Sequence, residues 1–319
     1  MKKFAYLIIA HDKFEQLQFL ISLLDNEETD IYIMIDKKSS VSSKMIEKLD
    51  ATLKKLSLFY VPSVDIRWGG YSLIKAEMKL FEISLKKEYD YYHLISGSDL
   101  PIENVKKINS FFEKEKDKCF LSLVEEKIKK KNRVEERVRY YHIFNERMLR
   151  GNKSPFLGKV LFKLDKINVN IQKILHIDLI KKYGIKKVGY ASNWVSLDRQ
   201  TVQLLVKNKN WIRKVFKNSF CADEIFIPTF LYQFGCTNKI YSKEPLHDKK
   251  DDVQGNLRYI NWWDGSPYTW KDGDEEKLDY AAQLGHFWSR KFNLNDSPNL
   301  RKYILKKNSN GGINDEDIN

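Results

Sequence analysis

The sequence predicts an α/β fold built around a mainly parallel sheet, because short apolar runs alternate with segments of helical periodicity. The first apolar run, Phe4 to Ala10, has the length of a buried strand. Apolar residues at helical spacing follow from Lys13 to Leu24, and a second apolar run occupies Ile31 to Ile35. A strand, a helix and a strand in this order open a parallel βαβ unit.

The same alternation continues through the first third of the chain. Helical spacing returns over 41–56 and 72–86, and strand-like runs lie at 58–62 and 91–95. Such a series is typical of a doubly wound domain, whose ligands bind beyond the carboxyl ends of the strands. We therefore expect functional residues at that edge of the sheet.

Polar residues cluster directly after four predicted strands. These groups are His11-Asp12, Asp36-Lys37-Lys38, Arg67-Trp68-Gly69-Gly70 and Ser96-Gly97-Ser98-Asp99. Their convergence on one sheet edge predicts a nucleotide-binding crevice. Neither a Gly-x-Gly-x-x-Gly motif nor a P-loop follows the first strand, which disfavours dinucleotide binding and P-loop phosphoryl transfer.

Composition indicates a folded protein with an anionic partner. Apolar residues make up 42% of the chain, and 56 Lys and Arg against 43 Asp and Glu give a net charge of +13. This charge suits a nucleic acid, a nucleotide diphosphate or an acidic membrane surface. Three cysteines without metal-ligand spacing indicate a reduced, intracellular protein. No segment is apolar enough to span a bilayer, so any membrane contact is expected to be peripheral.

The acidic pair Asp223-Glu224 lies in an apolar, aromatic stretch that runs from Phe220 to Pro228. A carboxylate against apolar walls keeps a basic lone pair, which makes Glu224 a candidate general base. The alternative is a pair of charges at a helix N-terminus with no chemical role.

An ordered set of motifs resembles a known family. The motifs are His11, Ile35-Asp36-Lys37-Lys38, Trp68-Gly69, Lys75-Ala76-Glu77, Ser96 to Ile102, Ser192-Asn193-Trp194, Ala222-Asp223-Glu224 and His286 to Phe292. Together they resemble the core-2/I-branching β-1,6-N-acetylglucosaminyltransferases and the related peptide xylosyltransferases. The resemblance implies a GT-A type glycosyltransferase fold, with a Rossmann-like mixed sheet flanked by helices.

The resemblance also implies the domain organisation and the reaction. We expect one catalytic domain over 1–305, with a nucleotide-binding half at about 1–105, an acceptor-binding half at about 106–305, and a disordered tail at 306–319. The implied reaction transfers a sugar from a UDP-sugar with inversion at the anomeric carbon. Glu224 would deprotonate the acceptor hydroxyl. Asp223, the other acid of the pair and a candidate substrate-binding residue, is expected to position Glu224 or the local backbone.

The diphosphate is expected to be stabilised without metal or other cofactor. Only Asp99 stands where many GT-A enzymes carry an Asp-x-Asp motif, and a single carboxylate holds Mg²⁺ or Mn²⁺ poorly. By resemblance, Lys291 and Arg258 would neutralise the departing diphosphate, with Arg290 as the alternative arginine. Outside this context, an Arg-Lys pair is more often a solvated helix end.

The remaining site residues divide between donor and acceptor. His11 and Asp36 are expected to contact uridine, Trp68 to stack on the base, and Asp99 to order the loop beneath the donor sugar. Their alternatives are a helix cap for His11, an Asx turn for Asp36 and a core position for Trp68. On the acceptor side the candidates are Arg139, Asn193 and Trp194.

Lysines and apolar residues alternate between about Gly151 and Lys187. An ordinary amphipathic helix with its apolar stripe on the core is the first interpretation. The alternative is an interfacial helix resting on anionic lipid, where a bacterial glycan grows on a lipid carrier.

The sequence as a whole predicts an inverting, metal-independent bacterial glycosyltransferase of polysaccharide assembly, cytoplasmic or peripheral on the inner face of the membrane. N-acetylglucosamine is the expected sugar, and xylose and galactofuranose remain open. The expected acceptor is a glycan hydroxyl, which a lipid could carry. The rival class is a non-catalytic basic protein that binds membranes or nucleic acid. Dispersed lysines and the lack of a recognition motif argue against nucleic acid.

Overall fold

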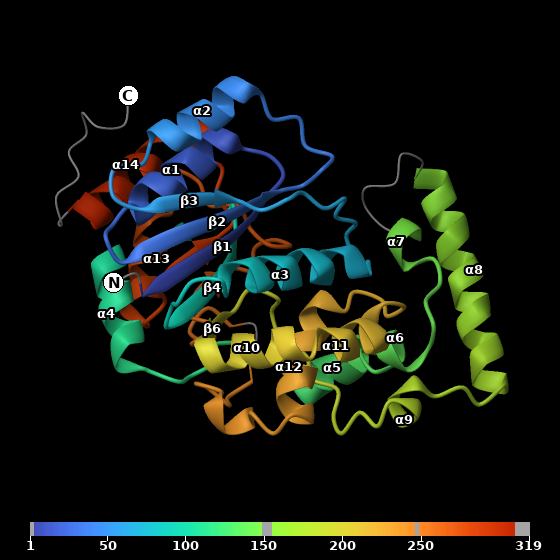
Figure 1. Cartoon of the computed structure of the whole chain (residues 1–319). Helices are drawn as coiled ribbons and strands as arrows, with labels where there is room; N and C mark the ends of the chain where they lie inside the picture. The colour runs from blue at the N-terminus through green and yellow to red at the C-terminus, as the bar shows by residue number, and fades with distance from the viewer. Residues whose placement is uncertain (1–2, 149–154, 246–248, 310–319) are drawn as a thin grey trace.

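The structure is a computed structural model that describes residues 3–148, 155–245 and 249–309. Its centre is a five-stranded sheet with the strand order β3-β2-β1-β4-β6 (Figure 1). The strands are β1 (Phe4–Ala10), β2 (Thr29–Ile35), β3 (Ser57–Tyr60), β4 (Tyr91–Ser96) and β6 (Ser196–Asp198). The first four run parallel, and β6 is antiparallel to β4. The four polar groups that follow β1 to β4 therefore meet at one edge.

Strand β1 is the central strand, and its seven residues are all buried. Alternate side chains of a strand point to opposite faces, so β1 contributes to two hydrophobic cores. One core contains Phe4, Tyr6 and Ile8, and the other contains Ala5, Leu7 and Ile9. This burial on both faces explains why the strand is a continuous apolar run.

Helices cover both faces of the sheet (Figure 1). On the Tyr6 side pack α1 (Phe14–Leu24), α2 (Ser43–Ala51), α4 (Val105–Lys114), α13 (Glu275–Gln283) and α14 (Pro298–Ser309). On the Leu7 side pack α3 (Tyr71–Ser84), α10 (Arg199–Lys207), α11 (Lys209–Phe216) and α12 (Asp223–Gln233). This three-layer arrangement confirms the predicted α/β class with a Rossmann-like mixed sheet.

A second sheet of three short strands brings the C-terminal part of the chain beside β4. Its order is β5 (Leu100–Pro101), β8 (Trp288–Arg290) and β7 (Arg258–Ile260). Leu100 pairs with Ser289, so the segment after β8 lies next to the loop after β4. Two short 3-10 helices, η1 (Thr237–Lys239) and η2 (Leu294–Asp296), complete this part of the fold.

The remaining helices form a separate group beside the sheet: α5 (Glu126–Lys131), α6 (Glu136–Arg139), α7 (Asn145–Met148), α8 (Pro155–Ile174) and α9 (Leu179–Lys182). Helix α8 stands at the periphery of the molecule, apart from the sheet (Figure 1). No helix in the described residues is both long and apolar enough to cross a membrane.

Two sequence predictions need correction. The expected disordered tail starts too early, because 306–309 continue α14, where Asn308 is buried and its side-chain oxygen accepts from the Val105 amide. Residues 310–319 of that tail lie outside the described part. The expectation that the apolar stripe of 151–187 packs on the core is also wrong for α8, since that stripe faces outward. Residues 151–154 of that segment lie outside the described part.

Candidate active site

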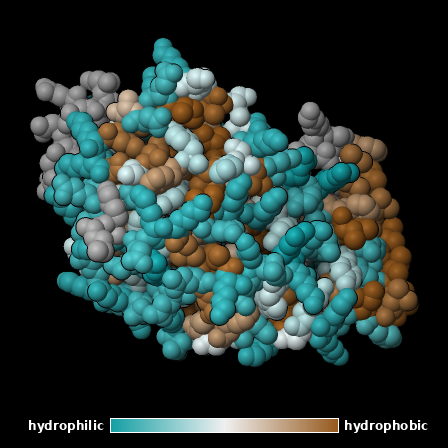
Figure 2. All heavy atoms as spheres, viewed as in Figure 1, coloured by the Kyte–Doolittle hydropathy of each residue, from teal (hydrophilic) through white to brown (hydrophobic). Residues whose placement is uncertain are grey.

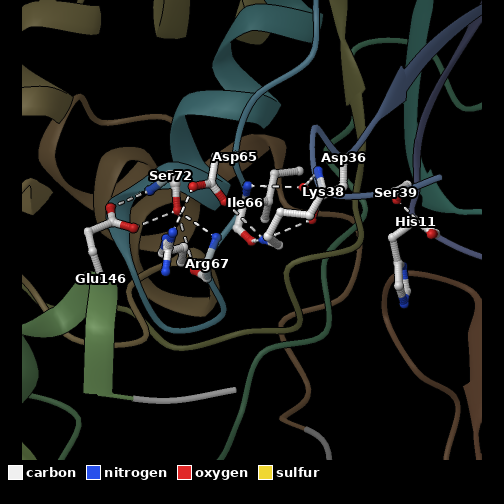
Figure 3. Close-up of polar contacts among 9 residues, drawn as sticks. All are labelled: His11, Asp36, Lys38, Ser39, Asp65, Ile66, Arg67, Ser72 and Glu146. Carbon is white, nitrogen blue, oxygen red and sulfur yellow. Dashed lines mark hydrogen bonds and ion pairs between the residues drawn. The ribbon is translucent and has the colours of Figure 1, made fainter. Parts of the chain in front are cut away.

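The loop after β2 is held by the carboxylate of Asp36. This residue is 8% exposed, and its Oδ1 accepts hydrogen bonds from the amides of Lys38 at 3.0 Å and Ile66 at 3.4 Å. The Lys38 ammonium lies 3.2 Å from Asp36 Oδ2 and 3.1 Å from Asp65 Oδ1. Figure 3 shows this network joining the loops after β2 and β3. Asp36 thus forms the Asx-type turn considered as its alternative role, at the edge where the nucleotide was expected.

His11 and Trp68 both project from this edge toward solvent. The His11 backbone carbonyl accepts from the Ser39 hydroxyl at 2.6 Å, while the ring points away from the Asp36 network (Figure 3). The ring is not a helix cap, because α1 has no side-chain cap. Trp68 is 54% exposed, so it is not a core residue. The His11 Nε2 lies 3.5 Å from Asp12 Oδ2, and both rings are accessible to a ligand from solvent.

The turn that presents Trp68 is fixed by Glu146 of α7. One Glu146 oxygen accepts from the Ser72 amide at 2.8 Å, and the other accepts from the Ser72 hydroxyl at 2.7 Å (Figure 3). The carboxylate lies so close to Gly70 that an added Cβ would stand 2.3 Å from its oxygen. A side chain at this position would therefore displace the Glu146 carboxylate from Ser72, by which α7 supports the start of α3.

The loop after β4 is ordered by Asp99, which is 1% exposed. Its two oxygens accept from the amide and the hydroxyl of Ser96, both at 3.0 Å. The Arg290 Nε lies 3.4 Å from Asp99 Oδ1, and the guanidinium stacks over the Trp194 ring at 5.0 Å. Asp99, Trp194 and Arg290 therefore form one cluster, drawn from both sheets.

Two lysines lie beside this cluster. Burial and the nearby charge of Lys291 both lower the pKa of Lys13, although Asp12 partly offsets the effect. The Lys13 ammonium donates to the carbonyl of Phe292 at 3.2 Å. Among the residues that the structure describes, no carboxylate pairs with the Lys291 ammonium. Lys13 was not expected from the sequence, and its backbone φ of 52° places it in a left-handed turn between β1 and α1.

Arg258, the first choice for the diphosphate, lies in the interior with 1% of its surface exposed. Its guanidinium donates to the carbonyls of Leu94, Trp194, Val195 and Asn256 at 3.1–3.3 Å. Burial lowers its pKa to about 10. Arg258 thus connects the two sheets through buried hydrogen bonds, whereas Arg290 lies at the edge of the strands beside Asp99.

Glu224 occupies the first turn of α12, where the helix dipole favours a negative charge. Its side chain is 39% exposed, and one oxygen lies 3.8 Å from the Arg137 Nη1. Burial raises the pKa of Glu224, while Arg137 and the Tyr190 hydroxyl act in the opposite direction. The result is a carboxylate that solvent can reach and that holds a proton more readily than an ordinary glutamate.

The arginine beside Glu224 is Arg137 rather than Arg139. The Arg139 guanidinium is occupied by Asp178 and by Glu135, at 3.0 Å from the latter. Residues two apart on a helix point in nearly opposite directions, so only one of the two arginines in α6 can face Glu224. Arg137 also lies over the Tyr190 ring at 5.6 Å.

Behind Glu224, two more acids are buried, and neither forms an ion pair with another of the described residues. Asp223 is 7% exposed, and burial together with the charge of Glu224 raises its pKa well above the usual range. Glu77 of α3 is fully buried, and neither of its oxygens has a hydrogen-bond partner in the described part of the chain. Burial and Asp223 strongly raise the pKa of Glu77, and the nearby Asn193 side chain lowers it without completing a well-formed hydrogen bond.

The segment Asn193-Trp194 lies between two parts of the site. We call the strand edge with Asp36, Asp99, Arg290 and Lys291 the cation side, and the group of Glu77, Asp223 and Glu224 the carboxyl side. Asn193 approaches Glu77 on the carboxyl side, and the adjacent Trp194 ring carries Arg290 on the cation side. Tyr190, which contacts Glu224, also lines a pocket of about 160 Å³ with Leu123, Lys129 and Lys187. Within the described residues, no three or more His, Cys, Asp and Glu side chains are grouped so that they could hold a metal ion.

Comparison with known proteins decides the family. The sequence profile described as "Core-2/I-Branching enzyme" matches residues 4–282, which include Asp99, Trp194 and Glu224 and end before Arg290 and Lys291. The chain belongs to the Core-2/I-Branching enzyme family. The fold is accordingly assigned to the GT-A type that was expected.

Curated relatives of this Core-2/I-Branching family member include xylosyltransferases. Xylosyltransferase 2 of Rattus norvegicus is 26% identical over 123 residues, which is 37% of this chain and 14% of that protein. A xylosyltransferase of Ciona intestinalis is 25% identical over 122 residues and again shares 14% of its length. The chain therefore spans only a small part of the curated relatives that it matches.

Solved structures show a looser likeness. Mouse xyloside xylosyltransferase 1 in its apo form aligns over 93% of this chain and 99% of its own, at 10% identity and a TM-score of 0.39. A complex of S. aureus TarS 1-349 with UDP aligns over 39% of this chain and 36% of its own, at 15% identity and a TM-score of 0.28. Neither alignment is close enough to assign a ligand or a residue role.

Proposed function

We propose that this chain is an inverting glycosyltransferase that moves a sugar from a UDP-sugar to a glycan hydroxyl. The observation that carries the proposal is that one fold presents both an accessible carboxylate, Glu224, whose charge is only weakly balanced by Arg137, and a cluster of cations at the edge of the sheet. A direct displacement needs a base beside the acceptor and positive charge beside the leaving diphosphate. Family membership over residues 4–282 supports this reaction.

Glu224 is the proposed general base. In the reaction it takes the proton of the acceptor hydroxyl while that oxygen forms a bond to the anomeric carbon and the bond to the diphosphate breaks. Its partial exposure lets an acceptor reach it, and its raised pKa gives it the basicity that proton transfer requires. The Tyr190 hydroxyl and Arg137 orient the carboxylate. We place the acceptor glycan in the pocket that Tyr190 lines.

Arg290 and Lys291 are the proposed diphosphate ligands, with Lys13 beside them. Asp99 fixes the Arg290 side chain from one direction and Trp194 supports it by stacking, so the cation is already oriented before a ligand arrives. Because both Asp99 oxygens are occupied by Ser96, this carboxylate is a poor metal ligand. We therefore propose that the diphosphate is stabilised by these side chains, without a metal ion.

For the nucleotide, we propose that Trp68 stacks on uracil and that His11 and the Asp36 turn contact the uridine. N-acetylglucosamine is the proposed sugar. Xylose is the second candidate, because the curated relatives over about a third of this chain are xylosyltransferases. Galactofuranose is a third. We place the enzyme in bacterial polysaccharide assembly, at the cytoplasmic face of the membrane with a glycan acceptor carried on lipid.

A donor screen tests this function. The purified chain is incubated with UDP-N-acetylglucosamine, UDP-xylose or UDP-galactofuranose and with a mixture of simple glycan acceptors, and products are identified by mass. We expect one donor to react far faster than the others and the product to have the inverted anomeric configuration. Retention of configuration would refute the single-displacement mechanism. Failure to bind UDP would refute the nucleotide-sugar assignment.

A further inference from the structure

Helix α8 has its polar and apolar faces reversed relative to an ordinary surface helix. Such a helix packs an apolar stripe on the core and exposes polar residues. In α8 the buried positions include Asp165 and Gln172, while the exposed positions include a row of large apolar side chains. That row is Leu157, Val160, Leu164, Ile167, Ile171 and Ile174, spaced alternately three and four residues apart. Ile167 is 55% exposed and Ile171 is 50% exposed.

Polar contacts hold α8 against the rest of the protein. The Asp165 carboxylate is hydrogen-bonded to the His142 ring at 2.6 Å. The Gln172 side chain accepts from the Tyr141 amide at 2.8 Å and donates to the Tyr141 carbonyl at 2.9 Å, and Asn168 donates to the same carbonyl at 2.6 Å. These contacts fix the rotation of the helix about its axis, so the outward direction of the apolar row is determined by the fold.

The apolar row lies at the surface and is bordered on one side by lysines. Figure 2 shows the hydrophobic residues of α8 along one edge of the molecule. On a helical wheel, Lys159, Lys163 and Lys166 occupy the sector between the buried side and the apolar row. The one acidic residue of α8 is Asp165, and it is buried against His142. The exposed surface of the helix is therefore apolar and positive.

We propose that this face of α8 is a docking surface for the interface of an anionic lipid bilayer. An interfacial helix buries an apolar face at the boundary of headgroups and acyl chains, while lysines at its border meet anionic headgroups. A second copy of the chain fits less well, because it would bring a lysine-bordered row against another such row without an exposed acid on α8 to compensate. The positive charge beside the apolar row therefore favours an anionic membrane over a second copy of the chain.

This docking surface is linked to the proposed catalytic base. The Phe162 ring of α8 lies 6.5 Å from the ring of Phe220, four residues before Glu224, and the His142 ring lies 5.6 Å from Phe220. A bilayer under α8 would therefore lie on the acceptor side of the molecule. The inference that the enzyme meets a lipid-carried acceptor there rests on the proposed function, whereas the docking itself does not.

Vesicle flotation with matched variants tests the docking surface. The full chain is mixed at low salt with vesicles of phosphatidylcholine alone or with an added fraction of phosphatidylglycerol. We expect flotation with the anionic vesicles only. Ile167→Glu and the pair Lys159→Gln/Lys163→Gln should each weaken binding by on the order of tenfold or more. The matched controls are Val253→Glu, at a residue that is 48% exposed elsewhere, and Lys44→Gln/Lys48→Gln, an equally spaced pair on α2. These should bind as the unmodified chain does.

Three results would overturn the proposal. They are no flotation at low salt, equal losses in the control variants, and a dimer by light scattering that Ile167→Glu converts to monomer while no variant binds vesicles. The last result would assign the face to a second copy. Thermal melting of each variant establishes that it is folded. Because flotation needs no sugar donor, a failed donor screen leaves this test intact, and intact UDP binding in a variant that no longer floats separates docking from catalysis.

Discussion

The two sides of the candidate site treat their carboxylates in opposite ways. On the cation side, Asp36 and Asp99 each accept at least two hydrogen bonds and lie beside Lys38 or Arg290. On the carboxyl side, Glu77 is buried with no hydrogen-bond partner among the described residues, and Glu224 has Arg137 at 3.8 Å. Satisfied carboxylates build a rigid frame, whereas poorly compensated ones remain basic. Asp36 and Asp99 are therefore the acids that hold the loops, and Glu224 is the accessible acid that can take part in proton transfer.

Replacing Glu224 on the carboxyl side should cause the largest loss of transfer activity. Glu224→Gln keeps the shape and removes the base, so we expect transfer to fall by about 100- to 10,000-fold while UDP affinity is unchanged. Turnover with the best donor and calorimetric titration with UDP measure the two quantities. Glu47→Gln, at an exposed position of α2, is the control. Activity near that of the control would assign the base to another residue.

Replacing Arg290 and Arg258 one at a time should distinguish a catalytic role from a structural one. We expect Arg290→Gln to lower turnover by about 100- to 1,000-fold with little change in melting temperature. Arg258→Gln should instead lower the free energy of unfolding by roughly 3 kcal/mol or more, because four buried carbonyls lose their donor. The opposite pattern would return the diphosphate role to Arg258.

The pH dependence of the transfer rate should reflect the raised pKa of Glu224. A base acts when it is deprotonated, so the rate should rise with pH through the pKa of Glu224, which burial raises above the ordinary value. Arg137 counters this shift, and Arg137→Gln should therefore move the rising limb to higher pH by about one unit. Arg139→Gln, two residues away, should leave the limb in place. A limb that moves equally in both variants would show that Arg137 has no special link to the base.

The smallest expected effect concerns stability at Glu77. Its folded pKa is raised above the unfolded value of about 4.3, so its contribution to stability is fully present below that pH. The contribution is lost as pH rises toward the folded pKa. Glu77→Gln removes this loss, and we expect a gain of about 1–3 kcal/mol at pH 8 that shrinks toward pH 4.

Denaturant unfolding across this pH range measures the effect, with Glu47→Gln as the exposed control. A gain at Glu77 that is the same at every pH would mean that the carboxyl does not titrate as described. A loss of stability at pH 8 would show that the buried acid has a partner that Gln cannot satisfy.

Much of the cation side could be predicted from sequence because it depends on local order. Apolar runs set the strands, parallel strands bring their carboxyl ends together, and the residues after them must share that edge. His11, Asp36, Trp68 and Asp99 were located in this way. The role of Arg258 was not predictable in the same manner, because its carbonyl partners come from β4, the start of β6 and its own segment.

The carboxyl side was predicted in part. The acidic pair in an apolar stretch pointed to Glu224, but choosing Arg137 instead of Arg139 as its neighbour required the rotation of a four-residue helix. Glu77 was expected only as part of the Lys75-Ala76-Glu77 motif, although its place on the α3 face of Leu73, Ile74, Leu80 and Phe81 indicates a buried acid. The outward stripe of α8 had no local signal, because its direction is fixed by polar contacts to Tyr141 and His142.

Turnover after removal of metal tests the account most directly. The unmodified chain and Arg290→Gln are treated with EDTA and assayed with the best UDP-sugar, before and after addition of Mn²⁺. If Arg290 and Lys291 neutralise the diphosphate, EDTA will leave the turnover of the unmodified chain unchanged, and Mn²⁺ will not restore Arg290→Gln. Loss of turnover in EDTA that Mn²⁺ restores in the unmodified chain would contradict the account.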